Sequence, residues 1–186
     1  MLISNVLRRI KYHFDETEPY YIVFAVALLA GSCAGAFTVG CLSDSLVSEI
    51  GIIMSDYKDA LANGFIVRDV VYEGIKNSLT MCIIIYICSF TPLAMASGVL
   101  VLAAKGFCIG FAAAGVFKCF TLKNALILLL QSTPYQLLSI AAIFLMAGIG
   151  VTNLKNGRTT AQNTMLFCTV YLLNIAGIIC EVLIKC

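Results

Sequence analysis

Long apolar runs alternate with short polar segments along this chain of 186 residues. A helix needs about 20 mainly apolar residues to cross the hydrocarbon core of a membrane, and several runs reach that length with few charges. The pattern therefore predicts an all-α fold, a polytopic transmembrane helical bundle of about five spans that forms one membrane domain over residues 1–186. The expected spans lie at about 20–42, 75–90, 93–117, 121–151 and 164–184.

The division of residues 78–117 leaves the number of spans open. Thr91 precedes Pro92, and the residue before a proline avoids the helical region, so the run divides there into two spans. The alternative is one span from Ser78 to Ala104 that ends at Lys105, which makes four spans in all. Basic residues leave both alternatives open, since one pair favours four spans and another favours five (Lys118 and Lys123; Lys155 and Arg158).

A polar segment with a proline interrupts the apolar run 121–151. Pro134 removes a backbone hydrogen bond and frees the carbonyl group four residues before it. Neighbouring polar side chains such as Gln131 can satisfy that carbonyl inside a membrane. The segment predicts a kinked or broken helix near Pro134, with Gln131 and Gln136 as candidate interior polar groups.

The polar regions on either side of the first span differ in charge. Residues 1–14 place apolar side chains at helical spacing opposite Arg8, Arg9 and Lys11, which predicts a basic interfacial helix. Residues 43–77 carry six acids and three bases, a net charge of −3. Because basic segments stay on the cytoplasmic side, we expect a cytoplasmic N-terminus and an extracytoplasmic loop at 43–77.

Part of this loop has the spacing of an amphipathic helix. Apolar residues recur at intervals of three and four from Leu46 to Leu61, and Asn63 with Gly64 ends the pattern. Such a helix rests on the outer membrane surface or packs over the ends of the spans, and it offers a platform for an extracellular partner. The candidate partner-facing residues are Asp44, Glu49, Asp56 and Asp59.

Small residues mark two helix surfaces. Gly31 and Gly35 are four residues apart in the first span, and Gly106 and Gly110 repeat that spacing later in the chain. Small residues at this spacing let two membrane helices approach closely. The surfaces pack either against a neighbouring span or against a second copy of the chain, so an oligomer stays among the expectations.

Lys105 lies in an apolar run, with several helical turns of hydrophobic residues on each side. A charged side chain at mid-membrane is costly and marks a site with a partner. One interpretation is structural: the side chain extends to an interface, or pairs with carbonyl groups at a helix break. The other is functional: it faces an interior that binds an anionic group, a lipid or a partner's charge.

Composition excludes several classes of protein. The chain is 61% hydrophobic and 12% charged, whereas soluble domains are about half apolar and a quarter charged. Its net charge of +2 is too small to indicate nucleic-acid binding. Nine cysteines form no CxxC pair, so we expect no metal and no cofactor. The expected spans contain no histidine and no aspartate, so we expect no enzyme activity.

Three short motifs resemble a known family. They are Lys-Gly-Phe-Cys-Ile-Gly-Phe at 105–111, Leu-Lys-Asn-Ala at 122–125 and Pro-Tyr-Gln-Leu-Leu at 134–138. Together with the basic N-terminus, the single first span and the outer loop, they are similar to the stage II sporulation protein M family of the bacterial membrane.

The resemblance implies a non-enzymatic membrane scaffold in the bacterial cytoplasmic membrane. In sporulating relatives such a scaffold holds two cell-wall hydrolases, stage II sporulation proteins D and P, during engulfment. The expected partners are therefore membrane lipids and extracytoplasmic cell-wall hydrolases. The alternative is a small transporter or lipid-handling subunit with a cavity around Lys105 and Gln131.

Overall fold

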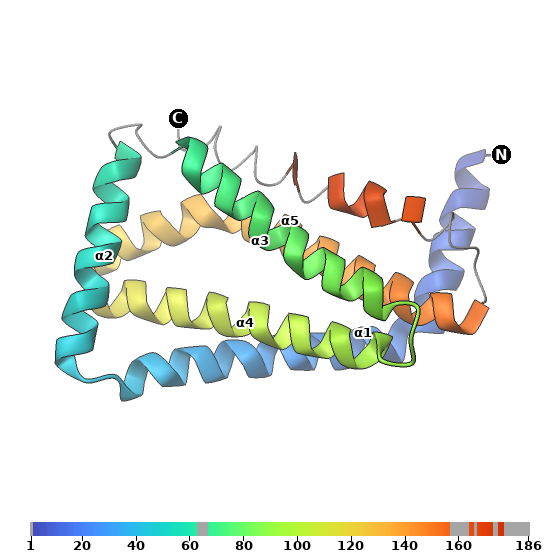
Figure 1. Cartoon of the computed structure of the whole chain (residues 1–186), viewed down its shortest axis with the longest axis horizontal. Helices are drawn as coiled ribbons and strands as arrows, with labels where there is room; N and C mark the ends of the chain where they lie inside the picture. The colour runs from blue at the N-terminus through green and yellow to red at the C-terminus, as the bar shows by residue number, and fades with distance from the viewer. Residues whose placement is uncertain (1, 63–66, 157–163, 166, 173–174, 177–186) are drawn as a thin grey trace.

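The computed structural model describes the backbone of residues 2–62, 67–156, 164–165, 167–172 and 175–176. Every regular element within this part of the chain is helical. The long helices are α1 (Leu2–Cys41), α2 (Asp44–Ala62), α3 (Val67–Cys88), α4 (Ala94–Cys119) and α5 (Leu122–Asn156). Figure 1 shows that α3, α4, α5 and most of α1 extend along the molecule, whereas α2 stands across one end.

Two helical segments are long and apolar enough to cross a membrane, judged by length and composition: Glu18–Cys41 of α1, and α4. They correspond to the predicted spans 20–42 and 93–117. Shorter apolar segments occupy Ile75–Cys88 of α3 and Gln136–Thr152 of α5. Most of the predicted last span, residues 164–184, lies outside the described residues, so the number of five spans stays a prediction.

The N-terminal helix is longer than predicted. Residues 1–14 were expected to form a separate interfacial helix, but α1 continues from Leu2 to Cys41 with Pro19 inside it. A proline within a helix removes a hydrogen bond, clashes with the preceding turn and bends the helix. In Figure 1 the first part of α1 turns across the direction of the rest. The basic segment and the first span therefore belong to one helix, and the two parts of that helix point in different directions.

Helices occupy most of the predicted loop 43–77. Most of it is helical, because α2 occupies Asp44–Ala62 and α3 begins at Val67. The amphipathic helix expected within this loop is α2, whose predicted end at Asn63 and Gly64 lies outside the described residues. The charged start of α3 is therefore a helical extension of the apolar segment that follows it.

A tight turn separates α3 from α4 at residues 89–93. The Thr91 amide donates to the Cys88 carbonyl oxygen over 3.0 Å, and the Ala94 amide donates to the Thr91 carbonyl oxygen over 3.1 Å. The chain reverses direction here, as the restriction before Pro92 predicts. The alternative of one helix from Ser78 to Ala104 is therefore wrong.

The polar segment at Pro134 does not interrupt its helix. Residues 122–156 form one continuous α5, so Pro134 lies inside a helix and the alternative of a broken helix is wrong. The ribbon of α5 changes direction near its middle in Figure 1. The side chains of residues 131–135 lie outside the described part of the chain.

Helices α1 and α4 run in the same direction and meet at glycines. A Cβ added to Gly31 would lie 2.9 Å from the carbonyl carbon of Ala103, and one added to Gly110 would lie 2.7 Å from the carbonyl carbon of Ser32. Real Cβ atoms do not approach backbone this closely, so only glycine fits. The four glycines of this contact are Gly31, Gly35, Gly106 and Gly110.

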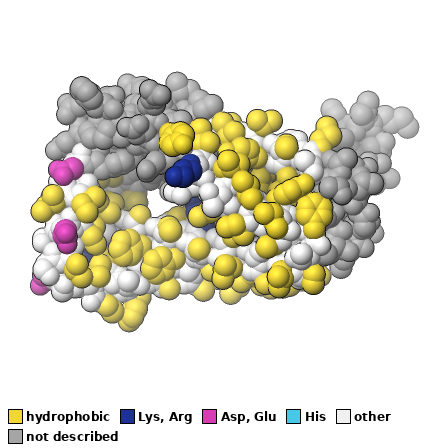
Figure 2. Space-filling view, in the orientation of Figure 1, with side chains coloured by type: hydrophobic (Ala, Val, Ile, Leu, Met, Phe, Trp, Pro, Cys, Tyr) yellow, Lys and Arg dark blue, Asp and Glu magenta, His cyan; other side chains and the backbone are white. Residues whose placement is uncertain are grey.

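The core of the bundle lies where α1, α3, α4 and α5 meet. Its fully buried side chains include Phe24, Leu102, Ile143 and Met146. Large apolar side chains are also exposed on the outside of the helices, for example Leu100 at 71%. An apolar core with an apolar exterior is the distribution expected of a helical bundle in lipid. Figure 2 shows hydrophobic side chains spread over the visible face of α3 and α4.

We predict that Gly110→Ala destabilises the bundle by about 1–3 kcal/mol, because its Cβ would overpack the α1 backbone. The measurement is thermal denaturation in detergent micelles, followed by circular dichroism. Gly40→Ala is the matched control, since a Cβ at Gly40 meets nothing within 4 Å. Equal melting temperatures for the two variants would contradict the close α1–α4 contact.

Candidate functional site

Lys105 belongs to the face of α4 that packs against α5. Ala94, Gly98 and Val101 are buried at spacings of four and three residues, and Lys105 continues that stripe. A Cβ added to Gly98 would lie 3.0 Å from the Ala147 Cβ, and one added to Gly150 would lie 3.9 Å from the Ala94 Cβ. These contacts make α4 and α5 antiparallel and direct the stripe toward α5.

Close packing of this stripe ends at Lys105. Val101 is buried and Lys105 is half-buried, whereas Cys108 and Ala112, which continue the same stripe, are exposed. The helices therefore separate just beyond Lys105. Lys105 therefore lies at the edge of the packed contact between α4 and α5.

Ser78 holds the equivalent position on α3. The buried stripe of α3 runs through Ile85 and Cys82 to Ser78. Ser78 precedes the end of α3 by ten residues and Lys105 follows the start of α4 by eleven, so both lie about 15–17 Å from the turn that joins the helices. The two residues therefore occupy the same level of the bundle.

The Ser78 hydroxyl is unusual among the buried hydroxyls. Ser78 is 6% exposed, and its Oγ is buried without a hydrogen-bond partner. Ser89 and Ser97, also buried, donate within their own helices to the Tyr86 and Ala94 carbonyl oxygens over 2.6 and 2.9 Å. A buried hydroxyl without a partner costs about 1–3 kcal/mol.

Ser139 brings a polar group of α5 to the same level. The α4–α5 contacts at Gly98 with Ala147 and at Gly150 with Ala94 place Lys105 opposite about residue 139, and Ser139 is 2% exposed. Gln136 lies about one turn away on α5, and its Oε1 is buried without a hydrogen-bond partner.

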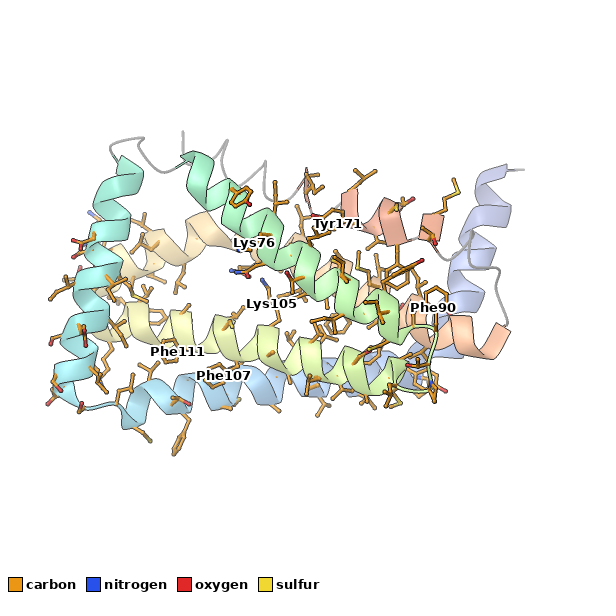
Figure 3. The ribbon with its side chains drawn as sticks, in the orientation of Figure 1. Lys76, Phe90, Lys105, Phe107, Phe111 and Tyr171 are labelled. Carbon is orange, nitrogen blue, oxygen red and sulfur yellow. The ribbon has the colours of Figure 1, made fainter. Side chains whose placement is uncertain are left out.

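Lys76 adds a second cation. Figure 3 shows the side chains of Lys76 on α3 and Lys105 on α4 extending into the space that separates these helices in this view, and Lys76 is exposed. Figure 2 shows the surface hollowed between α3 and α4, with Lys or Arg side chains on the wall of the hollow. We call this place the Lys105 recess, defined by Lys76 and Lys105. Ser78 lies two residues from the exposed Lys76 and is buried, so it faces another side of α3.

The helices around the recess supply few counter-charges. Neither α4 nor α5 contains an aspartate or a glutamate, and α1 contains none after Glu18. The acids of α3 are Asp69 and Glu73, whose side chains lie outside the described part of the chain.

The structure separates the sequence-predicted candidates into three places. The four glycines lie in the α1–α4 contact, as the intramolecular alternative predicted. Lys105 lies at the recess and Gln136 lies on α5 about one turn from its level, whereas the side chains of Gln131 and Pro134 are outside the described part of the chain. The partner-facing candidates Asp44, Glu49 and Asp56 are exposed on α2, and the side chain of Asp59 is not among those described.

Sequence reasoning did not single out Lys76 or Ser78. Lys76 counted only as one base of the expected loop, and Ser78 as the start of an apolar run. The signal that could have found them is their distance from Pro92. Folding the chain at this proline brings both residues near the level of Lys105 in an antiparallel pair.

Helix α2 packs on the end of α4 by its apolar side. The Cys119 Sγ lies 3.6 Å from the Val47 carbonyl oxygen and 3.5 Å from the position of a Cβ on Gly51. The Met54 methyl carbon lies 3.2 Å from the position of a Cβ on Gly115. This contact leaves the acids of α2 on its free side, and Figure 2 shows Asp and Glu side chains along that edge of the molecule.

Lys118 joins the ends of the two closely packed helices. Its Nζ donates to the Val39 carbonyl oxygen over 3.3 Å, in the last turn of α1. A cation at this place satisfies a terminal carbonyl and complements the negative end of the helix dipole. Lys118 therefore lies at the α2 end of the bundle, with Lys123 at the start of α5.

An apolar cavity of about 170 Å³ lies between α3, α5 and the described residues of 164–171. Cys82 and Tyr86 of α3, Met146 of α5, and Phe167 and Tyr171 line it. Tyr86 and Thr164 share a hydrogen bond of 2.7 Å at its edge. The lining offers little chemistry beyond contact with apolar groups.

We predict that Ser78→Ala raises the free energy of unfolding by about 1 kcal/mol, because it removes a buried hydroxyl without a partner. Thermal denaturation in detergent solution measures the change. The matched control Ser89→Ala loses a hydrogen bond and should lower stability by about 0.5–1.5 kcal/mol. A loss of stability in both variants would mean that the Ser78 hydroxyl is satisfied by the protein.

Comparison with models of protein families, with curated proteins and with solved structures finds no match to the chain. The resemblance to the stage II sporulation protein M family therefore stays a prediction from the motifs quoted for it. Functional interpretation depends on the residues and their geometry.

Proposed function

We propose that the protein is a non-enzymatic scaffold of the bacterial cytoplasmic membrane that presents α2 to a partner protein on the extracytoplasmic side. The observation that carries this proposal is the attachment of α2. The helix stands across the ends of the lengthwise helices, with one side packed on α4 and its acids exposed (Figure 1). A helix held in this way offers a charged surface of defined orientation.

The amphipathic pattern of α2 supports a position at a membrane surface. If α1 and α4 cross the bilayer, a helix perpendicular to their ends lies in the plane of the interface. Leu46 and Ile53 lie beside the packed side of α2 and are 47% and 64% exposed. These side chains can enter the lipid boundary while Asp44, Glu49 and Asp56 face water.

Charge at the two ends of the bundle supports the orientation. The N-terminal segment carries Arg8, Arg9 and Lys11, and α5 ends on the same side with Lys155. The opposite end carries the acids of α2 and also Lys118 and Lys123, so the difference between the ends comes from the N-terminal bases and the α2 acids. Because Lys and Arg stay on the cytoplasmic side, the N-terminal end faces the cytoplasm in this proposal and α2 faces outward.

The family resemblance gives the partner a chemical identity. In the stage II sporulation protein M family the implied partners are cell-wall hydrolases, and these enzymes work on the outer side of the membrane. An acidic surface favours partners with a complementary basic patch, because complementary charge speeds association and excludes other partners. The proposed partner is therefore a peptidoglycan hydrolase with a basic docking surface.

We predict that exchanging the three described acids of α2 for amides (Asp44→Asn, Glu49→Gln, Asp56→Asn) weakens hydrolase capture by about tenfold, through loss of complementary charge. The measurement is co-purification from membranes of the source cell after cross-linking, with hydrolases quantified by mass spectrometry. Glu18→Gln is the control, because Glu18 is exposed at the opposite end of the membrane segment. Unchanged hydrolase recovery with the triple variant would overturn the proposal.

We also predict that trypsin added to intact spheroplasts cleaves the chain near Lys58 and spares an epitope tag at the N-terminus. Lys58 lies in α2, which is extracytoplasmic in the proposed orientation. Cleavage at Lys58 divides the chain into two fragments that immunoblotting resolves. Loss of the N-terminal tag, with the remaining chain intact, would reverse the orientation.

A further inference from the structure

We propose that the apolar cavity between α3, α5 and the described residues of 164–171 binds a stretch of acyl chain from a membrane phospholipid. The inference rests on the membrane location that the proposed function assigns to these helices. It uses no part of the surface of α2. A scaffold can present α2 to its partner whether or not this cavity takes a lipid chain.

The lining of the cavity is suited to hydrocarbon. Cys82, Met146 and Phe167 line it and are all nearly or fully buried. Among the described residues, no charged side chain lines it. The hydroxyls of Tyr86 and Thr164 are bonded to each other over 2.7 Å. Because a buried water needs about two to four polar partners, this lining favours hydrocarbon over water.

The size and direction of the cavity match a stretch of acyl chain. Its volume is about 170 Å³, and a cavity of about 150 Å³ can hold benzene, so this one accepts about six carbon atoms. Its α3 wall extends from Leu79 to Tyr86, about 10 Å along the helix axis. If α3 crosses a membrane, this axis lies near the membrane normal, which is also the general direction of the acyl chains.

The cavity opens on an apolar exterior. Leu79 and Ile83 line it and are themselves 41% and 45% exposed. Cys168 lines it from the C-terminal segment and is also exposed. The apolar segments of its two long walls, Ile75–Cys88 and Gln136–Thr152, belong to the predicted spans 75–90 and 121–151. An acyl chain therefore reaches this opening directly from the bilayer, whereas a water-soluble ligand would first have to cross the headgroups.

Aromatic rings close one end of the cavity. Tyr86 is the lining residue of α3 nearest the α3–α4 turn, and its ring meets Phe167 edge to face with centroids 5.1 Å apart. Phe90 packs on Tyr86 in the same way, also at 5.1 Å. Together with the bond between Tyr86 and Thr164, these contacts join α3 to the C-terminal segment. An acyl chain therefore enters through the exposed side of the cavity and not past Tyr86.

The test places the full chain in nanodiscs of phosphatidylcholine that carries a photoreactive diazirine within one acyl chain. Illumination couples the lipid to neighbouring side chains, and mass spectrometry of peptides locates the adducts. Lipids that only surround the protein react with exposed residues such as Leu100. An acyl chain inside the cavity also reaches Met146, which lines the cavity and is 0% exposed. We expect adducts at Met146.

Variants that fill the cavity decide whether these adducts come from this site. Cys168→Phe adds a ring at the exposed side and should lower the adduct yield at Met146 by about tenfold, because the chain loses its contacts there. Leu79→Phe fills the cavity from α3, with the same expectation. Cys33→Phe is the matched control, since Cys33 is equally exposed but lies on α1, away from the cavity. Circular dichroism verifies that each variant keeps its helix content.

Three results would overturn the inference. The first is a set of adducts confined to exposed residues, which would mean that acyl chains stay outside the cavity. The second is an unchanged yield at Met146 in folded Cys168→Phe and Leu79→Phe. The third is an equal loss of yield in Cys33→Phe. Loss in the two filling variants with retention in Cys33→Phe supports the site. None of these results alters the capture of hydrolases by α2, so the two proposals fail separately.

Discussion

The close approach of α1 and α4 is the contact on which the rest of the bundle depends. If α1 and α4 cross a membrane, the hydrophobic effect does not drive them together there, and their attraction comes from van der Waals contact between backbones. Gly31 and Gly35 on one helix and Gly106 and Gly110 on the other allow this contact. Because α1 and α4 are parallel, the chain between them must cross the far end and return, and this requirement places α2 and α3.

This arrangement gives the two sides of α4 different roles. The side at Gly106 and Gly110 packs on the backbone of α1, and the stripe from Ala94 to Val101 packs on α5. Lys105 follows Val101 on that stripe. A side chain with a long stem and a charged end can occupy this place only because the helices part beyond it, as the exposure of Cys108 shows. The packing of α4 against both α1 and α5 therefore determines the direction of the Lys105 side chain.

The acids of α2 and Lys105 lie in different parts of the molecule. The acids of α2 lie on a surface at one end, whereas Lys105 lies at the middle of α4.

The sequence by itself determined the helical class, the apolar segments Glu18–Cys41 and Ala94–Cys119, and the reversal at Pro92. It did so because segment length, hydrophobicity and proline act locally along the chain. It did not determine that α1 continues through Pro19, that α2 stands across the bundle, or which helix meets the glycines of α1. Those features depend on contacts between residues far apart in the chain. For the same reason Lys105 was visible as an isolated charge, while its position at the edge of the α4–α5 contact required the tertiary structure.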